Sequence, residues 1–218
     1  EKIIFHKETK TFHLYNEEIS YIMCVLENGH MGQLYYGKRI HDKPDFSYLV
    51  EKCGRPMTSY IFEGDRSFSL EHIRQEYPVY GTTDYRHPAI EIMQENGSNI
   101  SEFQYVGYEI LKGKPSLKGL PATYTESEEE AETLKIILKD SLTGAKLTLL
   151  YTIFSKESAI ARSAHICNEG EKVLHLQTMM SLNLDLPDKD YVWMQLSGAW
   201  SRERYVKNRI LEQGITAI

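Results

Sequence analysis

The sequence predicts an all-β protein, a large sandwich of two antiparallel sheets over residues 1–218. Three observations lead to this prediction. Residues 133–154 have the pattern of a long β-hairpin, alternating segments recur with turn residues every about 8–12 positions, and no segment carries a convincing long helical period. The composition agrees, because 15 tyrosines favour strands.

The hairpin at residues 133–154 is the clearest element. Its first arm alternates, with Leu134, Ile136 and Leu138 on one face and mostly polar residues on the other, as in a half-buried strand. Residues 140–144 end in glycine and predict a short turn. The return arm is apolar on both faces, which predicts a strand in the interior of a sheet.

Four short strands are expected in the N-terminal part, separated by polar turns, as an antiparallel meander. They are residues 3–5, 12–15, 20–26 and 34–36. The segment from 40 to 75 is charged, contains proline and glycine and has no sustained period. A stretch of this length predicts a functional or mobile loop.

Two further strands, 89–94 and 100–111, are expected to form a hairpin around Asn96-Gly97-Ser98. The same residues match the N-glycosylation pattern, but no secretion signal is visible, so the turn is favoured. Residues 112–121 predict a connector, and the acidic residues 126–132 a solvated loop. Strands are expected at 159–168, 172–186 and 191–195, for a total of roughly a dozen to fifteen.

The overall charge gives no support to a nucleic-acid or membrane partner. The formal net charge is -6, the pI is about 5.8, and the longest apolar run is far shorter than the ~20 residues that span a bilayer. Cys24, Cys53 and Cys167 are few and widely spaced, which predicts free thiols in a reducing compartment. We therefore expect a cytoplasmic protein, although the chain starts at Glu1 and its beginning is expected to be trimmed.

The motifs of common catalytic and cofactor sites are missing from the sequence. The histidines and cysteines have no metal-ligand spacing, so no metal is expected. There is no nucleophile elbow and no dinucleotide-binding glycine motif, so no cofactor is expected either.

Asp84 and Arg86 place opposite charges two positions apart, on one face if the chain is extended. The favoured interpretation is an internal ion pair that fixes a loop. A ligand contact is the alternative.

Residues 198–204 combine Trp200 with Arg202, Glu203 and Arg204. A tryptophan offers a flat surface for the apolar face of a sugar and an N–H group for a hydroxyl. The alternative is a tryptophan that covers the edge of a core, beside a salt-bridged surface. The sequence favours neither of these two interpretations over the other.

Several stretches together resemble one family in its own order and cover nearly the whole chain. They are Tyr-Tyr-Gly-Lys at 35–38, Gln-Glu-Tyr-Pro at 75–78, Thr-Asp-Tyr-Arg-His-Pro-Ala at 83–89, Gly-Lys-Pro at 113–115 with Gly-Leu-Pro-Ala-Thr-Tyr at 119–124, Arg-Ser at 162–163 and Gly-Ala-Trp-Ser-Arg-Glu-Arg at 198–204. The chain resembles the N-terminal domain of the retaining α-galactosidases of glycoside hydrolase family 36.

The resemblance implies a β-sandwich that precedes a catalytic (β/α)8 barrel and a small C-terminal β domain. The resemblance also implies that the two catalytic aspartates lie in the barrel, beyond Ile218. Retention needs two carboxyl groups about 5–5.5 Å apart, and no residues of 1–218 are assigned to this pair. In tetrameric members, sandwich residues of one subunit reach the galactose pocket of another, which implies this role for Trp200. The family also uses a loop aspartate, for which Asp45 and Asp65 are the alternatives.

Three hypotheses follow for the function. The leading one is the front part of a cytoplasmic, tetrameric α-galactosidase acting on melibiose- or raffinose-type sugars. The second is a non-catalytic sandwich that binds carbohydrate, and the third is a domain that serves assembly alone. The gene sequence after Ile218 separates the first from the others.

Overall fold

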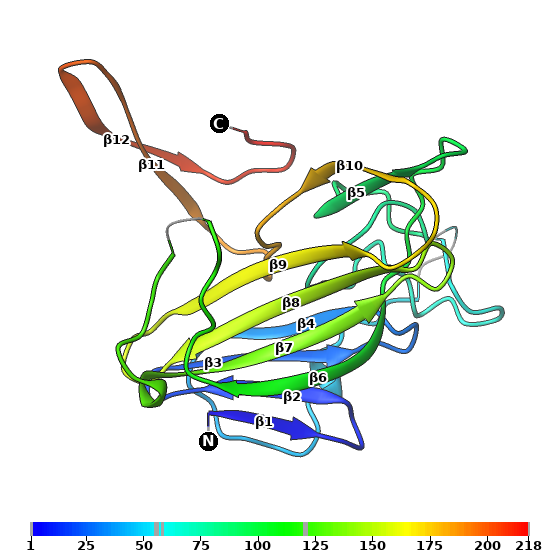
Figure 1. Ribbon diagram of the computed structural model, residues 1–218, viewed down its shortest axis with the longest axis horizontal. Helices are drawn as coiled ribbons and strands as arrows, with labels where there is room; N and C mark the ends of the chain where they lie inside the picture. The colour runs from blue at the N-terminus through cyan, green and yellow to red at the C-terminus, as the bar shows by residue number, and fades with distance from the viewer. Residues whose placement is uncertain (1, 55–56, 58, 120–121, 218) are drawn as a thin grey trace. The chain divides into compact units, whose positions relative to one another are not determined.

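The structure is a computed structural model that describes residues 2–54, 57, 59–119 and 122–217 (Figure 1). These residues contain twelve strands, two short 3₁₀ turns and no α-helix, which confirms the all-β prediction. The chain divides into two compact units, Glu1–Asp185 and Leu186–Ile218. Leu120 and Pro121 of the expected connector lie outside the described residues.

Two four-stranded antiparallel sheets form the body of the first unit. The first sheet has the order β1 (Ile3–His6), β2 (Thr11–Tyr15), β3 (Ile19–Val25), β4 (Met31–Lys38). The second has the order β6 (Gln104–Lys112), β7 (Ala131–Lys139), β8 (Ala145–Phe154), β9 (Ile160–Asn168). The 3₁₀ turns are Ser47–Leu49 and Glu128–Glu130.

Two smaller sheets each contain one antiparallel pair of strands. In the first unit, β5 (Ile90–Gln94) pairs with β10 (Leu174–Met179). In the second unit, β11 (Val192–Ala199) pairs with β12 (Arg202–Ile210). The two expected sheets are therefore present as the two large ones, and two two-stranded ribbons, one in each unit, were not expected as separate sheets.

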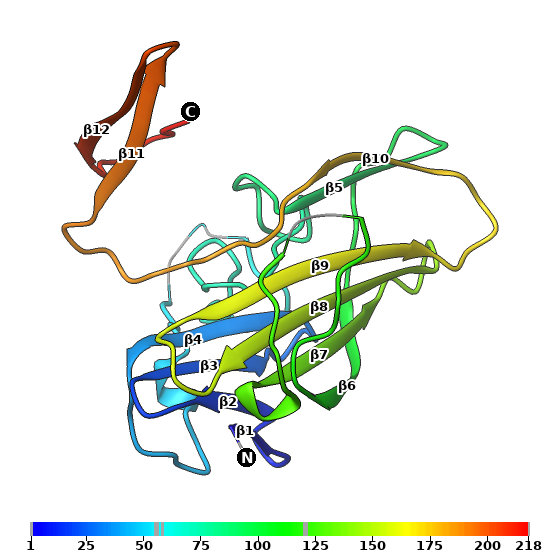
Figure 2. The ribbon, with the colours of Figure 1, turned by 60° about the vertical axis from the view of Figure 1, so that its left-hand side comes forward.

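The main core lies between the two large sheets, which stack face to face in the first unit (Figure 2). Phe12 and Met23 come from the first sheet and Leu134, Ile136 and Leu149 from the second, and all five are almost completely buried. Each such side chain stabilises the fold by about 1.5–3 kcal/mol relative to full exposure. The inward residues are those that the alternating pattern of the hairpin predicts.

A second core covers the other face of the first sheet. Ile22 and Leu34 of that sheet pack there against Phe46, Phe68 and Leu70 of the segment between β4 and β5. The described residues of this segment are irregular, as expected, apart from the 3₁₀ turn at Ser47–Leu49, and the buried ones form a layer of their own. The first sheet is therefore covered on both faces.

The central hairpin is formed as predicted. Strands β7 and β8 pair from Ala131 with Phe154 to Lys139 with Lys146. Strand β8 also pairs with β9 along its other edge, so it lies inside the sheet. The apolar character of both faces of the return arm indicated this position correctly.

The hairpin predicted around Asn96-Gly97-Ser98 is wrong. The turn exists, with Gly97 at φ 82°, but β5 pairs with β10 and β6 pairs with β7. The chain after the turn leaves the small ribbon for the second large sheet, where Phe103 enters the core. Strand β6 consequently starts at Gln104, later than expected.

Two other expectations differ from the structure near the C-terminal end. Of the strand expected over 172–186, only Leu174–Met179 is a strand, β10. Strand β12 was not predicted, because charged side chains lie on both of its faces. The three cysteines carry free thiols, as predicted. No helix in the described ranges is long and apolar enough to cross a membrane.

Candidate functional site

The tip of the β11–β12 hairpin carries the tryptophan singled out in the sequence. Trp200 and Ser201 form the two-residue loop between the paired residues Ala199 and Arg202. Ser201 has φ 59°, a left-handed conformation that is costly for a residue with a side chain. Trp200 is 91% exposed, so it does not cover the edge of a core in its own unit.

Polar side chains surround this tryptophan. Trp200, Ser201, Glu203 and Arg204 line a shallow hollow of about 330 Å³. In the part of the chain that the structure describes, no ion pair joins Arg202, Glu203 and Arg204, so the salt-bridged surface of the alternative interpretation is not formed. The tip therefore presents an aromatic face, a hydroxyl and both signs of charge.

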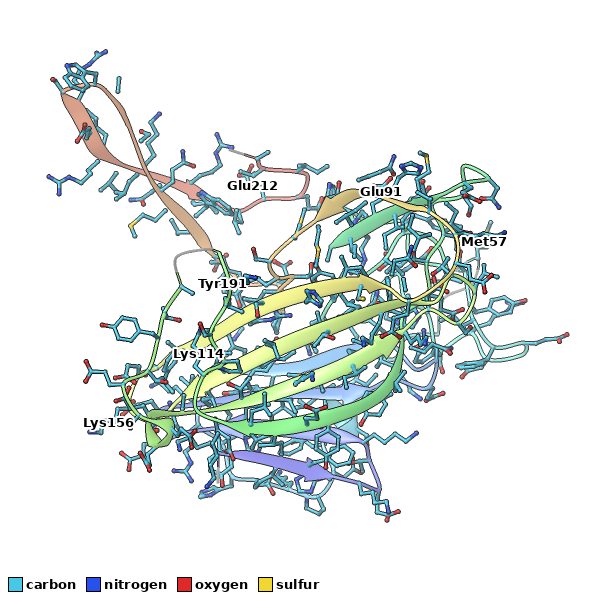
Figure 3. All side chains as sticks on the ribbon, viewed as in Figure 1. Met57, Glu91, Lys114, Lys156, Tyr191 and Glu212 are labelled. Carbon is cyan, nitrogen blue, oxygen red and sulfur yellow. The ribbon has the colours of Figure 1, made fainter. Side chains whose placement is uncertain are left out.

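The rest of this hairpin is largely exposed and carries many apolar side chains beside its charged ones. Figure 3 shows the side chains of β11 and β12 standing out on both sides of the ribbon. Besides Trp200, the exposed large apolar residues of the two strands are Val192, Trp193, Met194, Leu196, Tyr205, Val206 and Ile210. An isolated two-stranded hairpin is at best marginally stable in water, and contiguous exposed apolar surface marks interaction sites.

Asp45 and Asp65, the two candidate substrate aspartates, each close a local turn. Asp45 Oδ1 accepts a hydrogen bond from the Ser47 amide at 2.7 Å. Asp65 Oδ1 accepts bonds from the Ser67 hydroxyl at 2.6 Å and from its amide at 2.8 Å. These bonds lower the pKa of both aspartates, so both are charged at neutral pH.

Asp84 and Arg86 form the internal ion pair favoured by the sequence. Arg86 Nε lies 3.0 Å from Asp84 Oδ1, and Asp84 is buried. Gln75 Nε2 donates to Asp84 Oδ2 at 2.6 Å. The guanidinium also donates to the carbonyl oxygens of Leu70 and Ile73, so the pair holds the end of the long irregular segment.

A buried charged cluster at the centre of the sandwich was not predicted. The Glu76 carboxylate is completely buried and accepts hydrogen bonds from the Tyr21 hydroxyl at 2.7 and 2.8 Å and from the Tyr151 hydroxyl at 2.8 Å. Arg162 lies 3.2 Å from the same carboxylate and 4.5 Å from the Tyr151 ring centre. We call Tyr21, Glu76, Tyr151 and Arg162 the core network.

Burial controls the protonation of the core network. It raises the pKa of Glu76, an effect that Arg162 and the two hydroxyl donors oppose. It also raises the pKa of Tyr21 and Tyr151, so both hydroxyls remain donors. Because the carboxylate is enclosed, it has no access to a substrate. The core network therefore has a structural role.

A serine, a histidine and an aspartate also meet in the order of a hydrolase triad. Ser20 Oγ lies 2.9 Å from His13 Nε2, and Asp42 Oδ1 lies 2.7 Å from His13 Nδ1. Ser20 is completely buried, and its Oγ accepts a bond from the Ile40 amide at 3.1 Å. Without access to a substrate, this cluster anchors the segment after β4.

A large cavity follows the outer face of the second large sheet. It has a volume of about 970 Å³ and is lined by Ile137, Leu150, His165 and Met179 among others. None of the site residues predicted from the sequence lines it. In the described ranges no three acidic, histidine or cysteine residues are grouped to hold a metal ion.

The hairpin, the buried motifs and the sandwich together have relatives of known activity. The model of the "Glycosyl hydrolase family 36 N-terminal domain" matches residues 29–218. Alpha-galactosidase AgaA of Geobacillus stearothermophilus is 41% identical over 215 residues, which are 99% of this chain and 29% of that protein. Alpha-galactosidase Mel36A of Lactobacillus acidophilus is 34% identical over 214 residues, 98% of this chain and 29% of that protein.

Solved structures give the same result for the fold. The alpha-galactosidase of Lactobacillus brevis superimposes with a TM-score of 0.93 at 37% identity, over 97% of this chain and 28% of that one. A variant of AgaA in complex with raffinose gives a TM-score of 0.89 at 42% identity, over 94% of this chain and 28% of that one. This chain thus spans less than a third of the length of these relatives. It belongs to glycoside hydrolase family 36, as an N-terminal domain of that family.

Proposed function

We propose that this chain is the N-terminal domain of a retaining α-galactosidase, with a catalytic (β/α)8 barrel outside residues 1–218. The enzyme hydrolyses terminal α-galactosyl residues of oligosaccharides of the melibiose and raffinose type. The relatives support this proposal, because AgaA and Mel36A are alpha-galactosidases and a variant of AgaA is described in complex with raffinose.

The role of this domain is to support a tetramer and to complete the galactose pocket of a neighbouring subunit. The observation that carries this role is the position of Trp200, which is 91% exposed in a two-residue loop whose other residue, Ser201, has φ 59°. Strained loop residues are costly and cluster at binding sites. An exposed indole gives a sugar a flat apolar surface and one hydrogen-bond donor.

The exposed apolar strands around Trp200 supply the contact area for assembly. Val192, Leu196 and Val206 lie along the same hairpin and are more than half exposed. Such side chains are expected to be covered by another subunit. Asp45 or Asp65 would add a charged contact to a galactose hydroxyl, since Asp45 is exposed, Asp65 is half-exposed and both are ionised.

The free thiols of Cys24, Cys53 and Cys167 support a cytoplasmic location for this enzyme. The acidic net charge of -6 favours neither nucleic acid nor an anionic membrane as a partner. Its partners are then galactosides, its own barrel and further copies of the same chain.

The test is a set of tryptophan variants in the full-length enzyme. Trp200→Ala is expected to lower kcat/KM for raffinose by about 10–100-fold, roughly 1.4–2.7 kcal/mol of transition-state stabilisation, mainly through KM. Trp200→Phe keeps an aromatic surface and should retain most of the activity. Sedimentation velocity checks that the variants remain tetramers.

Trp193→Phe is the matched control, because Trp193 lies on the same hairpin and its indole donates to Gln195 instead of standing at the tip. It should behave as the wild type. Native tetramers of Trp200→Ala with wild-type kcat/KM would refute the shared pocket.

A further inference from the structure

The last residues of the first unit are held by buried groups from distant parts of the chain. The backbone N–H of Gln75 donates to Asp185 Oδ2 at 2.9 Å, and Asn183 Nδ2 donates to the backbone carbonyl oxygen of Gln75 at 2.9 Å. Arg162 donates to the Asn183 carbonyl oxygen. Asn183 also donates to Asp185 Oδ1 at 3.2 Å. We call Gln75, Arg162, Asn183 and Asp185 the clamp.

Both anchoring residues of the clamp are themselves immobilised. The Arg162 guanidinium is fixed by Glu76 and by the Tyr151 hydroxyl, which it reaches at 3.0 Å. The Gln75 side chain donates to buried Asp84, and Asp84 is paired with Arg86. The clamp therefore connects the core network with the Asp84–Arg86 ion pair. Among the described residues, no hydrogen bond or ion pair joins these two clusters directly.

The position of the clamp in the chain is informative. Asp185 is the last residue of the first unit, and Leu186 begins the unit that carries Trp200. Strand β11 starts at Val192, so only a short linker separates the clamp from the hairpin. Three of the sequence stretches that resemble the family, around residues 75, 84 and 162, meet at this one point.

We propose that Gln75, Arg162 and Asp185 are positioning residues for Trp200. They fix the point at which the chain leaves the sandwich, just before the linker to the hairpin. The inference rests on the proposed function, because it requires that Trp200 contacts the substrate.

The physical reason is the conformational entropy that the chain around Trp200 loses when the side chain binds. A tryptophan at the end of a freely moving arm loses conformational freedom whenever it enters a pocket, and this loss weakens binding. An arm whose root is already fixed loses less. A small displacement of a group that contacts the substrate also lowers the rate. A shift of about 1 Å from the productive position is enough to reduce it strongly.

Asp185→Ala in the full-length enzyme tests the inference, because it removes the two carboxylate acceptors of the clamp at a half-buried position outside the core network. It is expected to lower kcat/KM for raffinose by about 3–10-fold, mainly through KM, at temperatures well below Tm. A modest fall in Tm accompanies this loss, because the buried Gln75 backbone N–H is left without its acceptor. Asp185→Asn retains one acceptor oxygen and should recover part of the loss. Asp188→Ala is the control, because Asp188 lies exposed in the same linker.

A double-mutant cycle separates the inference from the proposed function. In a Trp200→Ala background, Asp185→Ala should cause no further loss, because the residue that it positions is gone. If Trp200→Ala matters but Asp185→Ala keeps wild-type kcat/KM, or if the two losses multiply, the clamp does not act through Trp200. If Trp200→Ala itself has no effect, the proposed function fails and the inference fails with it.

Hydrogen exchange gives a readout that does not depend on activity. Amides of residues 186–191 are expected to exchange several-fold faster in Asp185→Ala than in Asp188→Ala, while β7 and β8 remain protected as in the wild type. Equal exchange of the linker in the two variants would overturn the inference, whatever their activities.

Discussion

The guanidinium of Arg162 lies 3.2 Å from the carboxylate of Glu76, and both side chains are enclosed between the two large sheets. Each charge depends on the other, because the Glu76 side chain is completely buried and the Arg162 side chain is only 7% exposed. Tyr21 and Tyr151 donate to the remaining lone pairs of the carboxylate. A buried pair of this kind is sensitive to the loss of one member and tolerant of the loss of both.

Arg162→Met should therefore destabilise the protein by about 3–5 kcal/mol, because it leaves the Glu76 carboxylate buried and uncompensated. Lys52→Met is the control, since its ion pair with Glu27 is about half exposed, and should cost less than about 1 kcal/mol. Urea unfolding measures both. The double variant Glu76→Leu with Arg162→Met should be more stable than Arg162→Met alone; additive losses would contradict this account.

Asp84→Ala in the full-length enzyme should lower the melting temperature while the rate at low temperature stays close to that of the wild type. The substitution leaves the side-chain Nε2 of Gln75 and the backbone N–H of Arg86 without their acceptor. The half-exposed Arg86 guanidinium can instead form hydrogen bonds with water. The expected loss is about 1–3 kcal/mol. Thermal melting and kcat at low temperature check both expectations. A variant with native Tm and abolished turnover would assign Asp84 to the substrate instead.

Stability should fall as the pH is lowered below about 6.5, partly because of His13. Burial lowers the pKa of His13, against the Asp42 carboxylate, which raises it. The folded state therefore binds a proton less readily than the unfolded chain, whose histidine has a pKa of 6.5. The stabilisation is present above that pH and is lost as the pH falls toward the lowered pKa.

His13→Gln should reduce this pH dependence, measured as the free energy of unfolding at about pH 7.5 and 5.5. Burial also lowers the pKa of His30, which acts with the same sign, so part of the dependence should remain. An unchanged slope in His13→Gln would show that His13 does not titrate in this range.

The 218-residue chain by itself should not hydrolyse p-nitrophenyl α-galactoside. Retaining hydrolysis needs two carboxyl groups about 5–5.5 Å apart, and the enclosed Glu76 and the paired Asp84 cannot serve. The expectation rests on the catalytic pair lying in the barrel. Turnover by the purified chain above that of a mock preparation would place the catalytic pair within residues 1–218.

The parts of the fold that the sequence predicted are those in which neighbouring residues carry the signal. Leu134, Ile136 and Leu138 alternate with residues of the opposite face, and this local pattern is enough to define a half-buried strand. The pairing of β5 with β10 was missed because strands distant in sequence form it. Strand β12 lacks alternation because nothing in its own unit buries one of its faces.

The same distinction applies to the candidate site. Asp84 and Arg86 lie two positions apart, so their ion pair could be predicted. Glu76 and Arg162 lie 86 positions apart, and only the topology of the sheets brings them together. Their motifs were visible in the sequence, but a glutamate beside a strand does not indicate which cation will reach it.

Gly198→Ala should impair the full-length enzyme almost as much as Trp200→Ala, although the indole remains. A Cβ atom at Gly198 would lie 2.1 Å from the Arg202 carbonyl oxygen and 2.8 Å from Glu203 Cα, so the two strands must separate at the tip. This movement displaces Trp200 without removing any contact group. The first unit should keep its Tm, because the substitution lies outside its core.

Gly107→Ala is the matched control, because a Cβ atom there meets nothing within 4 Å. It should retain wild-type kcat/KM, whereas Gly198→Ala is expected to lose about 10-fold. Combined with Trp200→Ala, Gly198→Ala should add nothing, since both substitutions remove the same contact. Wild-type kcat/KM in Gly198→Ala would mean that the geometry of the tip does not matter, and that Trp200 contributes through exposed area alone.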